Sequence, residues 1–217
     1  MSNSKGVFIA FEGIDGCGKS TQATLLADKL ESKGFDVLLT REPGGTQIGS
    51  QLRSLLLNDN QNMSWETEVL LMAADRAQHV AEVIRPALQR GAIVISDRYV
   101  YSSLAYQGYG AGQSVATVKQ VNDLAVQGVW PDLTILLMLE PEYRYGRDGE
   151  ADRIEQRGLV YQRRVFEGFK QLAQSQANIS AIDVAGHNKN QVAAMIWQVC
   201  LASLTQLRER IEGESSI

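Results

Sequence analysis

The chain has 217 residues, is 44% hydrophobic and carries a net charge of −4 at pH 7. This size and hydrophobic content suit one domain with a sizeable core. The acidic balance argues against a general attraction to nucleic acid or an anionic membrane. No run approaches the roughly 20 apolar residues that a membrane helix needs. Two cysteines and a short polar N-terminus without signal-peptide features indicate a reduced, cytoplasmic protein.

The first organised stretch is an apolar segment over 7–11, followed by a glycine-rich turn and a helix predicted over 19–33. The turn fits the spacing of a phosphate-binding loop: Gly13, four residues, then Gly18, Lys19 and Ser20. Glycines let backbone N–H groups surround phosphate oxygens, and the helix N-terminus adds positive potential. Lys19 is predicted to reach the β- and γ-phosphates, and Ser20 to ligate Mg²⁺. The alternative is an ordinary glycine-rich turn between a strand and a helix. The predicted nucleoside triphosphate contacts are Gly13, Ile14, Asp15, Gly16, Cys17, Gly18, Lys19, Ser20 and Thr21.

Further along the chain, buried strands alternate with helices. Strands are predicted over 36–40, 92–96, 133–139 and 179–184, and helices over 47–57, 64–89, 115–128, 159–177 and 190–210. The residues from 101 to 112 form a Ser-, Tyr- and Gly-rich stretch that we assign to no element, and Pro86 is expected to kink the helix over 64–89. Apolar strands alternating with helices predict an α/β fold of the P-loop NTPase type. This is a three-layer sandwich with a five-stranded parallel sheet covered by helices on both faces.

Polar residues follow two of these strands, and ligands bind beyond the carboxyl ends of parallel strands. The segment 41–46 follows the second strand, and Asp97 and Arg98 follow the third. Asp97 is predicted to orient Mg²⁺ through its second shell of ligands, unless it is only a turn or cap residue. Arg98 is predicted to bind a phosphate that the loop does not hold.

Arginines are dense after the fourth strand, at positions 144, 147, 153, 157, 163 and 164. We interpret about 144–158 as a closing lid that excludes water and neutralises a migrating phosphoryl group. The alternative is a solvated helix whose acidic residues balance the arginines. His79 and His187 are interpreted as surface or capping residues, because phosphoryl transfer needs no imidazole.

Several motifs together resemble the thymidylate kinase family. In family order and over most of the chain, they are 11–21 (FEGIDGCGKST), 40–46 (TREPGGT), 73–76 (AADR), 97–99 (DRY), 105–108 (AYQG), 131–134 (PDLT) and 152–155 (DRIE). The phosphate loop alone is shared by many enzymes, whereas the combination of TREPGGT, DRY and AYQG is far more specific.

The resemblance implies a single nucleoside monophosphate kinase domain over 1–217 that converts ATP and dTMP to ADP and dTDP, with Mg²⁺, as a cytoplasmic homodimer. It implies that Asp15 meets the sugar 3′-hydroxyl, Arg76 the thymine base and Arg98 the dTMP phosphate. The implied dTMP-binding set is Asp15, Arg41, Pro43, Met72, Arg76, Arg98, Ser103, Tyr106 and Gln107.

The implied catalytic residues include Lys19, Asp15 and Arg98, together with an arginine of the lid. The position after Asp15 is Gly16, which has no basic side chain, so the resemblance is to the bacterial-type arrangement whose lid supplies the catalytic arginine. Arg153 is the first choice for it, followed by Arg147 and Arg144.

Four positions depart from the family pattern, and two of them are Tyr101 and Met138, each in place of a usual aspartate. Met72 stands where an aromatic residue usually stacks on thymine, and Ala111 where an arginine is common. Met72 and Ala111 leave open a kinase for another pyrimidine monophosphate such as dUMP. Two further alternatives are a non-catalytic nucleotide-binding protein, against which Lys19, Ser20, Asp97 and Arg98 speak, and a nucleic-acid-associated ATPase. The acidic balance speaks against the last.

Overall fold

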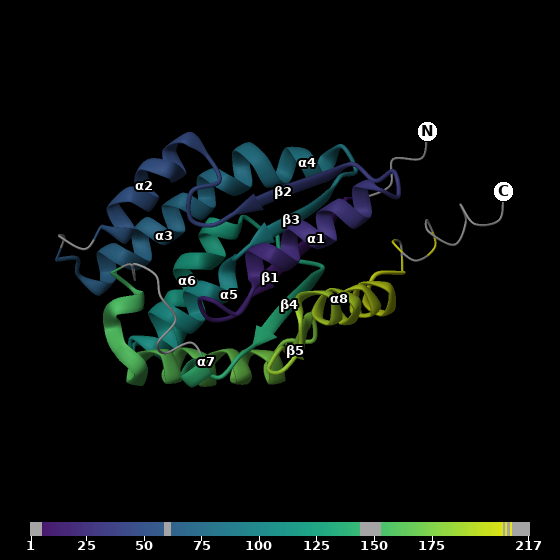
Figure 1. Ribbon diagram of the computed structural model, residues 1–217. Helices are drawn as coiled ribbons and strands as arrows, with labels where there is room; N and C mark the ends of the chain where they lie inside the picture. The colour runs from purple at the N-terminus through teal and green to yellow at the C-terminus, as the bar shows by residue number, and fades with distance from the viewer. Residues whose placement is uncertain (1–5, 59–61, 144–152, 206, 208, 210–217) are drawn as a thin grey trace.

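The computed structural model describes residues 6–58, 62–143, 153–205, 207 and 209. Its centre is a sheet of five parallel strands in the order β2-β3-β1-β4-β5 (Figure 1). The strands are β1 (Val7–Glu12), β2 (Val37–Arg41), β3 (Ile93–Asp97), β4 (Leu133–Met138) and β5 (Ile179–Asp183). The predicted five-stranded parallel sheet is confirmed, with strand bounds within about a residue of those expected.

The strands differ in burial according to their place in the sheet. Every residue of β1 is buried, because this strand lies between β3 and β4. We expected β2 to be buried as well, which is wrong: it is an edge strand, and Leu39 is 42% exposed. The apolar run of β2 indicated a strand but not its position in the sheet.

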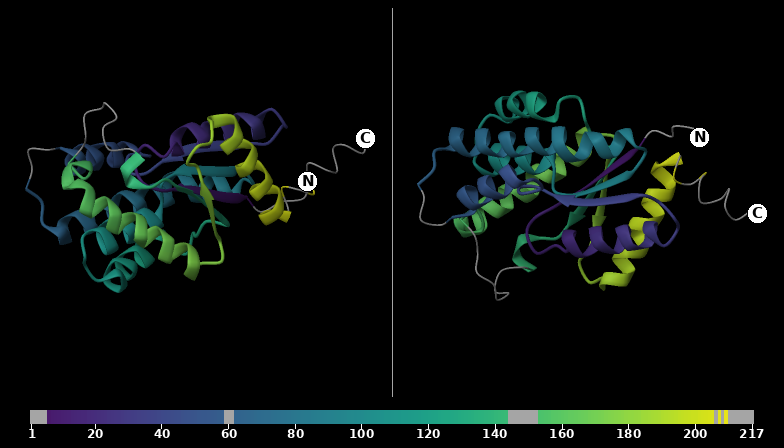
Figure 2. Two further views of the ribbon diagram at one scale, coloured as in Figure 1. Left: turned by 60° about the horizontal axis from the view of Figure 1, so that its bottom comes forward. Right: turned by 90° about the horizontal axis from the view of Figure 1, so that it is seen from above.

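Helices cover both faces of the sheet (Figure 2). On one face, α1 (Lys19–Glu31) packs on β1, β2 and β3, and α8 (Lys189–Ser203) packs on β4 and β5. On the other face, α4 (Arg85–Gln89) packs on β3, and α7 (Gly158–Ser175) packs on β4 and β5. The remaining α-helices are α2 (Gln47–Leu57), α3 (Trp65–His79), α5 (Val100–Ser103) and α6 (Val115–Val126).

The helix predicted over 64–89 is present with a π-helical segment inside it, η1 (Val80–Ile84), between α3 and α4. Pro86 follows this segment and has no N–H to donate to the preceding turn. The N–H of Arg85 bonds the carbonyl of Val80, five residues back, so the helix continues through a wider turn.

The Ser-, Tyr- and Gly-rich stretch is helical too, as α5 and the π-helical segment η2 (Leu104–Gly110). Gly110 is needed here for close approach: a Cβ at that position would lie 2.5 Å from Val165 of α7. Dense packing against α7 therefore holds in helical form a segment that no local pattern marked as a helix. Two short 3₁₀ turns, η3 (Pro141–Tyr143) and η4 (Glu155–Arg157), complete the described elements. Within the described ranges, no helix is both long and apolar enough to cross a membrane.

Candidate functional site

The phosphate loop joins β1 to α1 at the carboxyl edge of the sheet. Gly13 has a φ of 136°, and a Cβ there would meet the carbonyl oxygen of Leu137 at 2.4 Å, so this turn requires glycine. Gly18 caps α1 in the left-handed conformation. The ammonium of Lys19 folds back over the loop and donates to the carbonyl of Ile14 at 2.8 Å. The loop therefore has the backbone curvature and the cation that an anionic ligand needs.

The end of β3 faces the first turn of α1. The hydroxyl of Ser20 donates to Oδ2 of Asp97, whereas Oδ1 of Asp97 is buried and has no hydrogen-bond partner among the described residues. A hydroxyl and an orphaned carboxylate oxygen beside a phosphate loop fit Mg²⁺, which prefers oxygen ligands and keeps several waters. The predicted pair of Ser20 and Asp97 is thus brought together.

The residues around the loop line a cavity that we call the loop cavity. Its lining comprises Asp15, Gly16, Gly18, Lys19, Ser20, Thr21, Arg41, Glu42, Arg53, Asp97 and Arg98. Of the remaining residues of the predicted loop set, Gly13 and Ile14 are buried beneath it. Cys17 faces a separate cavity described below.

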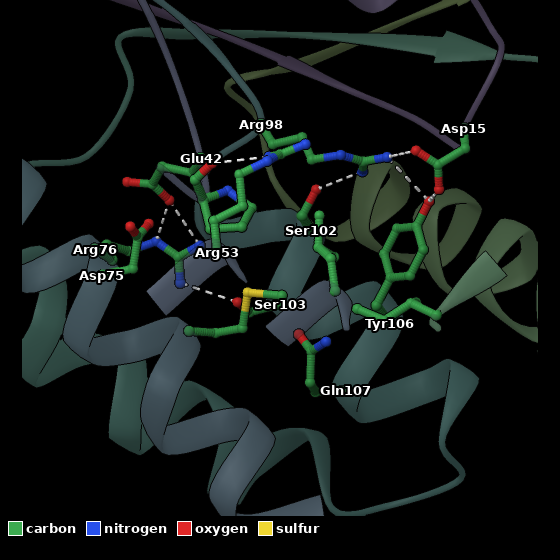
Figure 3. Close-up of a pocket in the computed structure, with 14 residues that line it drawn as sticks. Asp15, Glu42, Arg53, Asp75, Arg76, Arg98, Ser102, Ser103, Tyr106 and Gln107 are labelled. Atoms are coloured by element: carbon green, nitrogen blue, oxygen red, sulfur yellow. Dashed lines mark hydrogen bonds and ion pairs between the residues drawn. The ribbon is translucent and has the colours of Figure 1, made fainter. Parts of the chain in front are cut away.

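A second cavity, the inner cavity, shares lining residues with the loop cavity, and Figure 3 shows the residues that line it. It is lined by Asp15, Glu42, Pro43, Arg53, Leu57, Met72, Asp75, Arg76, Arg98, Ser102, Ser103, Tyr106, Gln107 and Ile154. Eight of the nine residues of the predicted dTMP set are therefore brought together. The exception is Arg41, which lines the loop cavity and is not among the residues of the inner cavity.

An ion pair stands where the two cavities meet. The guanidinium of Arg98 donates to Asp15 and to the hydroxyl of Ser102 at 3.1 Å, and the hydroxyl of Tyr106 donates to the other oxygen of Asp15 at 2.9 Å (Figure 3). Arg98 has a φ of 73°, a left-handed conformation that costs a non-glycine residue about 1 kcal/mol or more. A positive charge is thus held in a strained backbone position between two cavities.

Arg76 lies under the inner cavity with its guanidinium buried. Its donors go to the carboxylate of Glu42 at 2.8 Å, the hydroxyl of Ser103 at 3.0 Å, the carbonyl of Tyr99 at 3.0 Å and the amide oxygen of Asn122. A ligand base that accepts from Arg76 would therefore share or displace the bond to Ser103, which lines the same cavity.

Two further residues extend this network. His79 is fully buried, with Nδ1 at 2.9 Å from Glu42 and Nε2 at 2.7 Å from the hydroxyl of Thr40. The expectation that His79 is a surface or capping residue is wrong, because it joins α3 to the end of β2. Asp75 accepts from the N–H of Gly44 at 3.0 Å, and burial together with the nearby charge of Glu42 raises the pKa of Asp75 to about 6. Charged groups of α3 thus hold the segment 41–46 in place.

No sequence pattern had pointed to Arg53 on α2. It lines both cavities, and its guanidinium donates to the carbonyl of Pro43 at 2.8 Å. Only the packing of α2 behind the segment 41–46 reveals this second cationic group, because an arginine on an amphipathic helix ordinarily faces solvent.

The predicted lid falls partly outside the described residues, and Arg144 and Arg147 lie in that part. Arg153 is described, and its guanidinium donates to the carbonyl of Leu56 at 2.9 Å and to Glu68 at 2.6 Å. It therefore lies beside the inner cavity, against α2 and α3, and is not among the residues that line the loop cavity.

A third cavity opens on the outer side of the phosphate loop, between α1 and the β5–α8 connection. Its lining comprises Gly16, Cys17, Gly18, Thr21, Gln22, Leu139, Tyr143, Val184, Ala185, Gly186, His187, Lys189 and Val192. No part of the β5–α8 connection had been predicted as a site. Its side chains mix apolar residues such as Leu139 and Val184 with His187 and Lys189, and no recognisable motif in the sequence joins them.

Comparison with known proteins agrees with this geometry. A family model described as thymidylate kinase matches residues 11–196. The chain is 45% identical to a thymidylate kinase of Exiguobacterium sibiricum over 94% of this chain and 97% of that one. It is 48% identical to a thymidylate kinase of Halothermothrix orenii over 78% and 85%. A crystal structure of thymidylate kinase from Ehrlichia chaffeensis superposes with a TM-score of 0.74 at 34% identity, covering 90% of this chain and 98% of that one. The chain therefore belongs to the thymidylate kinase family.

Proposed function

We propose that this enzyme transfers the γ-phosphate of ATP to dTMP and forms ADP and dTDP. One observation carries the proposal: the loop cavity and the inner cavity share Asp15, Glu42, Arg53 and Arg98. A triphosphate held by the loop and a monophosphate held in the inner cavity would thus meet at a common wall with two arginines. In-line transfer requires such an arrangement of donor and acceptor.

On the donor side, the phosphates of ATP bind the loop and Lys19, and the nucleoside extends into the third cavity beside the β5–α8 connection. Ser20 and Asp97 would hold Mg²⁺, Ser20 directly and Asp97 through water, since Ser20 already bonds one oxygen of Asp97 and the other has no partner in the described part of the chain. When bound, the metal neutralises charge on the β- and γ-phosphates.

On the acceptor side, the inner cavity takes dTMP. Arg98 and Arg53 face its phosphate, Asp15 accepts from the sugar 3′-hydroxyl, and Met72, Ser103 and Gln107 surround the base. Arg76 stands beneath the base and holds Ser103. Pro43 and Tyr106 complete the walls.

In the transfer, a phosphate oxygen of dTMP attacks the γ-phosphorus, a new P–O bond forms, and the bond to the β–γ bridging oxygen breaks. The electrons of that bond leave with ADP. Lys19 and Arg98 stabilise the negative charge on the migrating group, and a lid arginine adds a further positive charge because Gly16 offers none. The lid, about 144–158, belongs with the rest of 1–217 to a single kinase domain in this proposal.

We also propose a cytoplasmic homodimer. Leu70 of α3 is 59% exposed and Leu124 of α6 is 83% exposed, and these two helices pack against each other. Exposed leucines on two helices that pack together are typical of a surface that a partner covers. Analytical ultracentrifugation of the wild type and of Leu70→Glu with Leu124→Glu tests this: a dimer that dissociates in the variant supports it, and a monomeric wild type contradicts it.

Measurement of ADP release tests the activity, with Mg²⁺·ATP and a panel of nucleoside monophosphates. Turnover that depends on dTMP and exceeds that with dUMP, dCMP and dGMP is expected. ATP binding without turnover of any acceptor would favour a non-catalytic nucleotide-binding protein. Preference for dUMP would favour a different pyrimidine kinase, as Met72 in place of an aromatic residue left open.

A further inference from the structure

A buried carboxylate lies between the inner cavity and residues 153–157, in the described part of the predicted lid. Glu68 of α3 is 1% exposed, and its Oε2 accepts from Nη2 of Arg153 at 2.6 Å and from Nη2 of Arg157. One oxygen atom therefore receives two guanidinium groups. Arg157 is itself held by Tyr161, whose hydroxyl bonds the carbonyl of Tyr106 at 3.0 Å.

The other oxygen of Glu68 reaches a residue of the inner cavity. Its Oε1 accepts from the amide nitrogen of Gln107 at 2.9 Å. The main-chain carbonyl of Gln107 accepts from the indole N–H of Trp65 at 2.7 Å, which fixes the backbone at this residue. The side chain of Gln107 points toward the interior of the cavity (Figure 3). Among the described residues its Oε1 has no hydrogen-bond donor.

The charge of Glu68 decides which way this amide is turned. Burial by itself would raise the pKa of Glu68, but the charge of Arg157, the hydrogen bond from Gln107 and the contacts of Arg153 lower it below its ordinary value. Glu68 is therefore ionised at neutral pH, and an ionised carboxylate only accepts hydrogen bonds. The NH₂ group of Gln107 must face Glu68, which leaves its carbonyl oxygen for the cavity.

We propose that Glu68 is a positioning residue for base selection: it holds Gln107 with an acceptor, not a donor, toward the pyrimidine. Thymine presents a donor at N3, whereas cytosine presents an acceptor at N3 and a donor at C4. A fixed side-chain carbonyl oxygen in the cavity can accept a hydrogen bond from the N3–H of thymine. The same oxygen would repel the N3 acceptor of cytosine. The inference rests on the proposed function, because it assigns the pyrimidine to the same cavity.

The substitution Glu68→Gln should reverse this polarity. Arg153 and Arg157 can only donate, so the oxygen of the new amide must face them and its NH₂ must face Gln107. The side-chain amide of Gln107 would then flip. Its oxygen would accept from the new NH₂ group at position 68, and its own NH₂ group would face the cavity. The NH₂ group of Gln107 would then face the N3–H of thymine, so dTMP should bind more weakly. The same NH₂ group can donate to the N3 acceptor of cytosine.

The experiment compares kcat/KM for dTMP and for 5-methyl-dCMP, which keeps the methyl group and changes only the base edge at N3 and C4. In Glu68→Gln the ratio is expected to fall at least tenfold, mainly through a higher KM for dTMP. Glu66→Gln, an exposed residue of the same helix, is the matched control and should keep the wild-type ratio. Circular dichroism checks that each variant is folded. Gln107→Ala removes the amide and should also lower the ratio, and Glu68→Gln should lower it no further in that background.

A loss that is equal for the two acceptors in Glu68→Gln would overturn the proposal, because it would show a merely structural role. An unchanged ratio in Gln107→Ala would overturn it as well, and this second result decides the matter if Glu68→Gln does not fold. Absence of dTMP turnover in the wild type would instead refute the proposed function, so the two failures are distinguishable.

Discussion

Asp15 of the phosphate loop and Arg98 after β3 form an ion pair that joins two segments 83 residues apart in the chain. Each residue borders both the loop cavity and the inner cavity. A guanidinium that a carboxylate already holds needs little reorientation to bind an incoming phosphate. The pair thus positions the acceptor-binding charge before the substrate arrives.

Replacing Arg98 should therefore weaken the binding of dTMP and leave the binding of ATP nearly unchanged. We expect Arg98→Ala to raise the KM for dTMP at least 100-fold, because a charge-assisted contact to the phosphate is lost and the negative charge of Asp15 is no longer balanced by Arg98. The dissociation constant for ATP, measured by titration calorimetry, should change less than threefold. Arg90→Ala, which removes an exposed arginine paired with Asp36, is the matched control and should change neither value. A normal KM for dTMP in Arg98→Ala would remove Arg98 from the acceptor site.

Lys19 should act on the chemical step. Its ammonium already lies over the loop and donates to the carbonyl of Ile14. From this position it can stabilise the negative charge of the phosphoryl group during transfer. Lys19→Ala is expected to lower kcat by about 10²–10³-fold, as the loss of one charge-stabilising group does in other enzymes. Single-turnover measurement of dTDP formation checks this. Lys29→Ala on the same helix should behave like the wild type, and comparable rates in the two variants would contradict the assignment.

Local patterns were enough to predict the sheet and the phosphate loop. Both depend on contiguous signals: apolar runs of strand length, and glycine spacing that the backbone itself requires. The residues that border the cavities at strand ends, Asp97 and Arg98, followed from the geometry of parallel sheets, in which those ends share one edge.

The charged network around Glu42 could not be predicted in the same way. His79 and Arg76 face Glu42 because α3 packs behind the end of β2, and no spacing in the sequence encodes that contact. The same holds for Glu68, which resembles any acidic residue in the first turn of a helix until residues 153–157 are seen to fold over it. The contacts of these residues thus depend on segments that are distant in sequence, and local sequence patterns could not predict them.

Glu12 gives the protein a measurable pH dependence of stability. Burial raises its pKa from 4.5 to about 7, although Ser102, Arg98 and Tyr99 partly oppose the change. The folded state therefore binds a proton more tightly than the unfolded state does. The free energy of unfolding should be greatest below about pH 4.5 with respect to this group and fall as the pH rises through 7, by up to about 3 kcal/mol.

Glu12→Gln isolates this contribution because glutamine resembles the protonated acid. Its oxygen can accept from the N–H groups of Tyr99 and Ser102, and its NH₂ can donate to the Ser102 hydroxyl. Near pH 5 the wild type and the variant should have similar Tm values, whereas near pH 8 the variant should be higher by several degrees. Asp75 titrates in both proteins and cancels from the comparison. Parallel Tm curves from pH 5 to 8 would mean that Glu12 keeps an ordinary pKa.

The arginines of the lid should divide into two kinetic classes. Arg153 is bonded to Leu56 and Glu68 on the side of the inner cavity, so we expect Arg153→Ala to raise the KM for dTMP and to change single-turnover chemistry less than tenfold. Arg147→Ala is expected to lower the single-turnover rate by 10²-fold or more, because an arginine that stabilises a transferring phosphoryl group contributes about 10³–10⁵. Arg163→Ala, an exposed residue paired with Glu142, serves as the control. If Arg153→Ala instead loses the chemical step at unchanged KM, Arg153 must leave Glu68 during the reaction and take the role expected of it from the sequence.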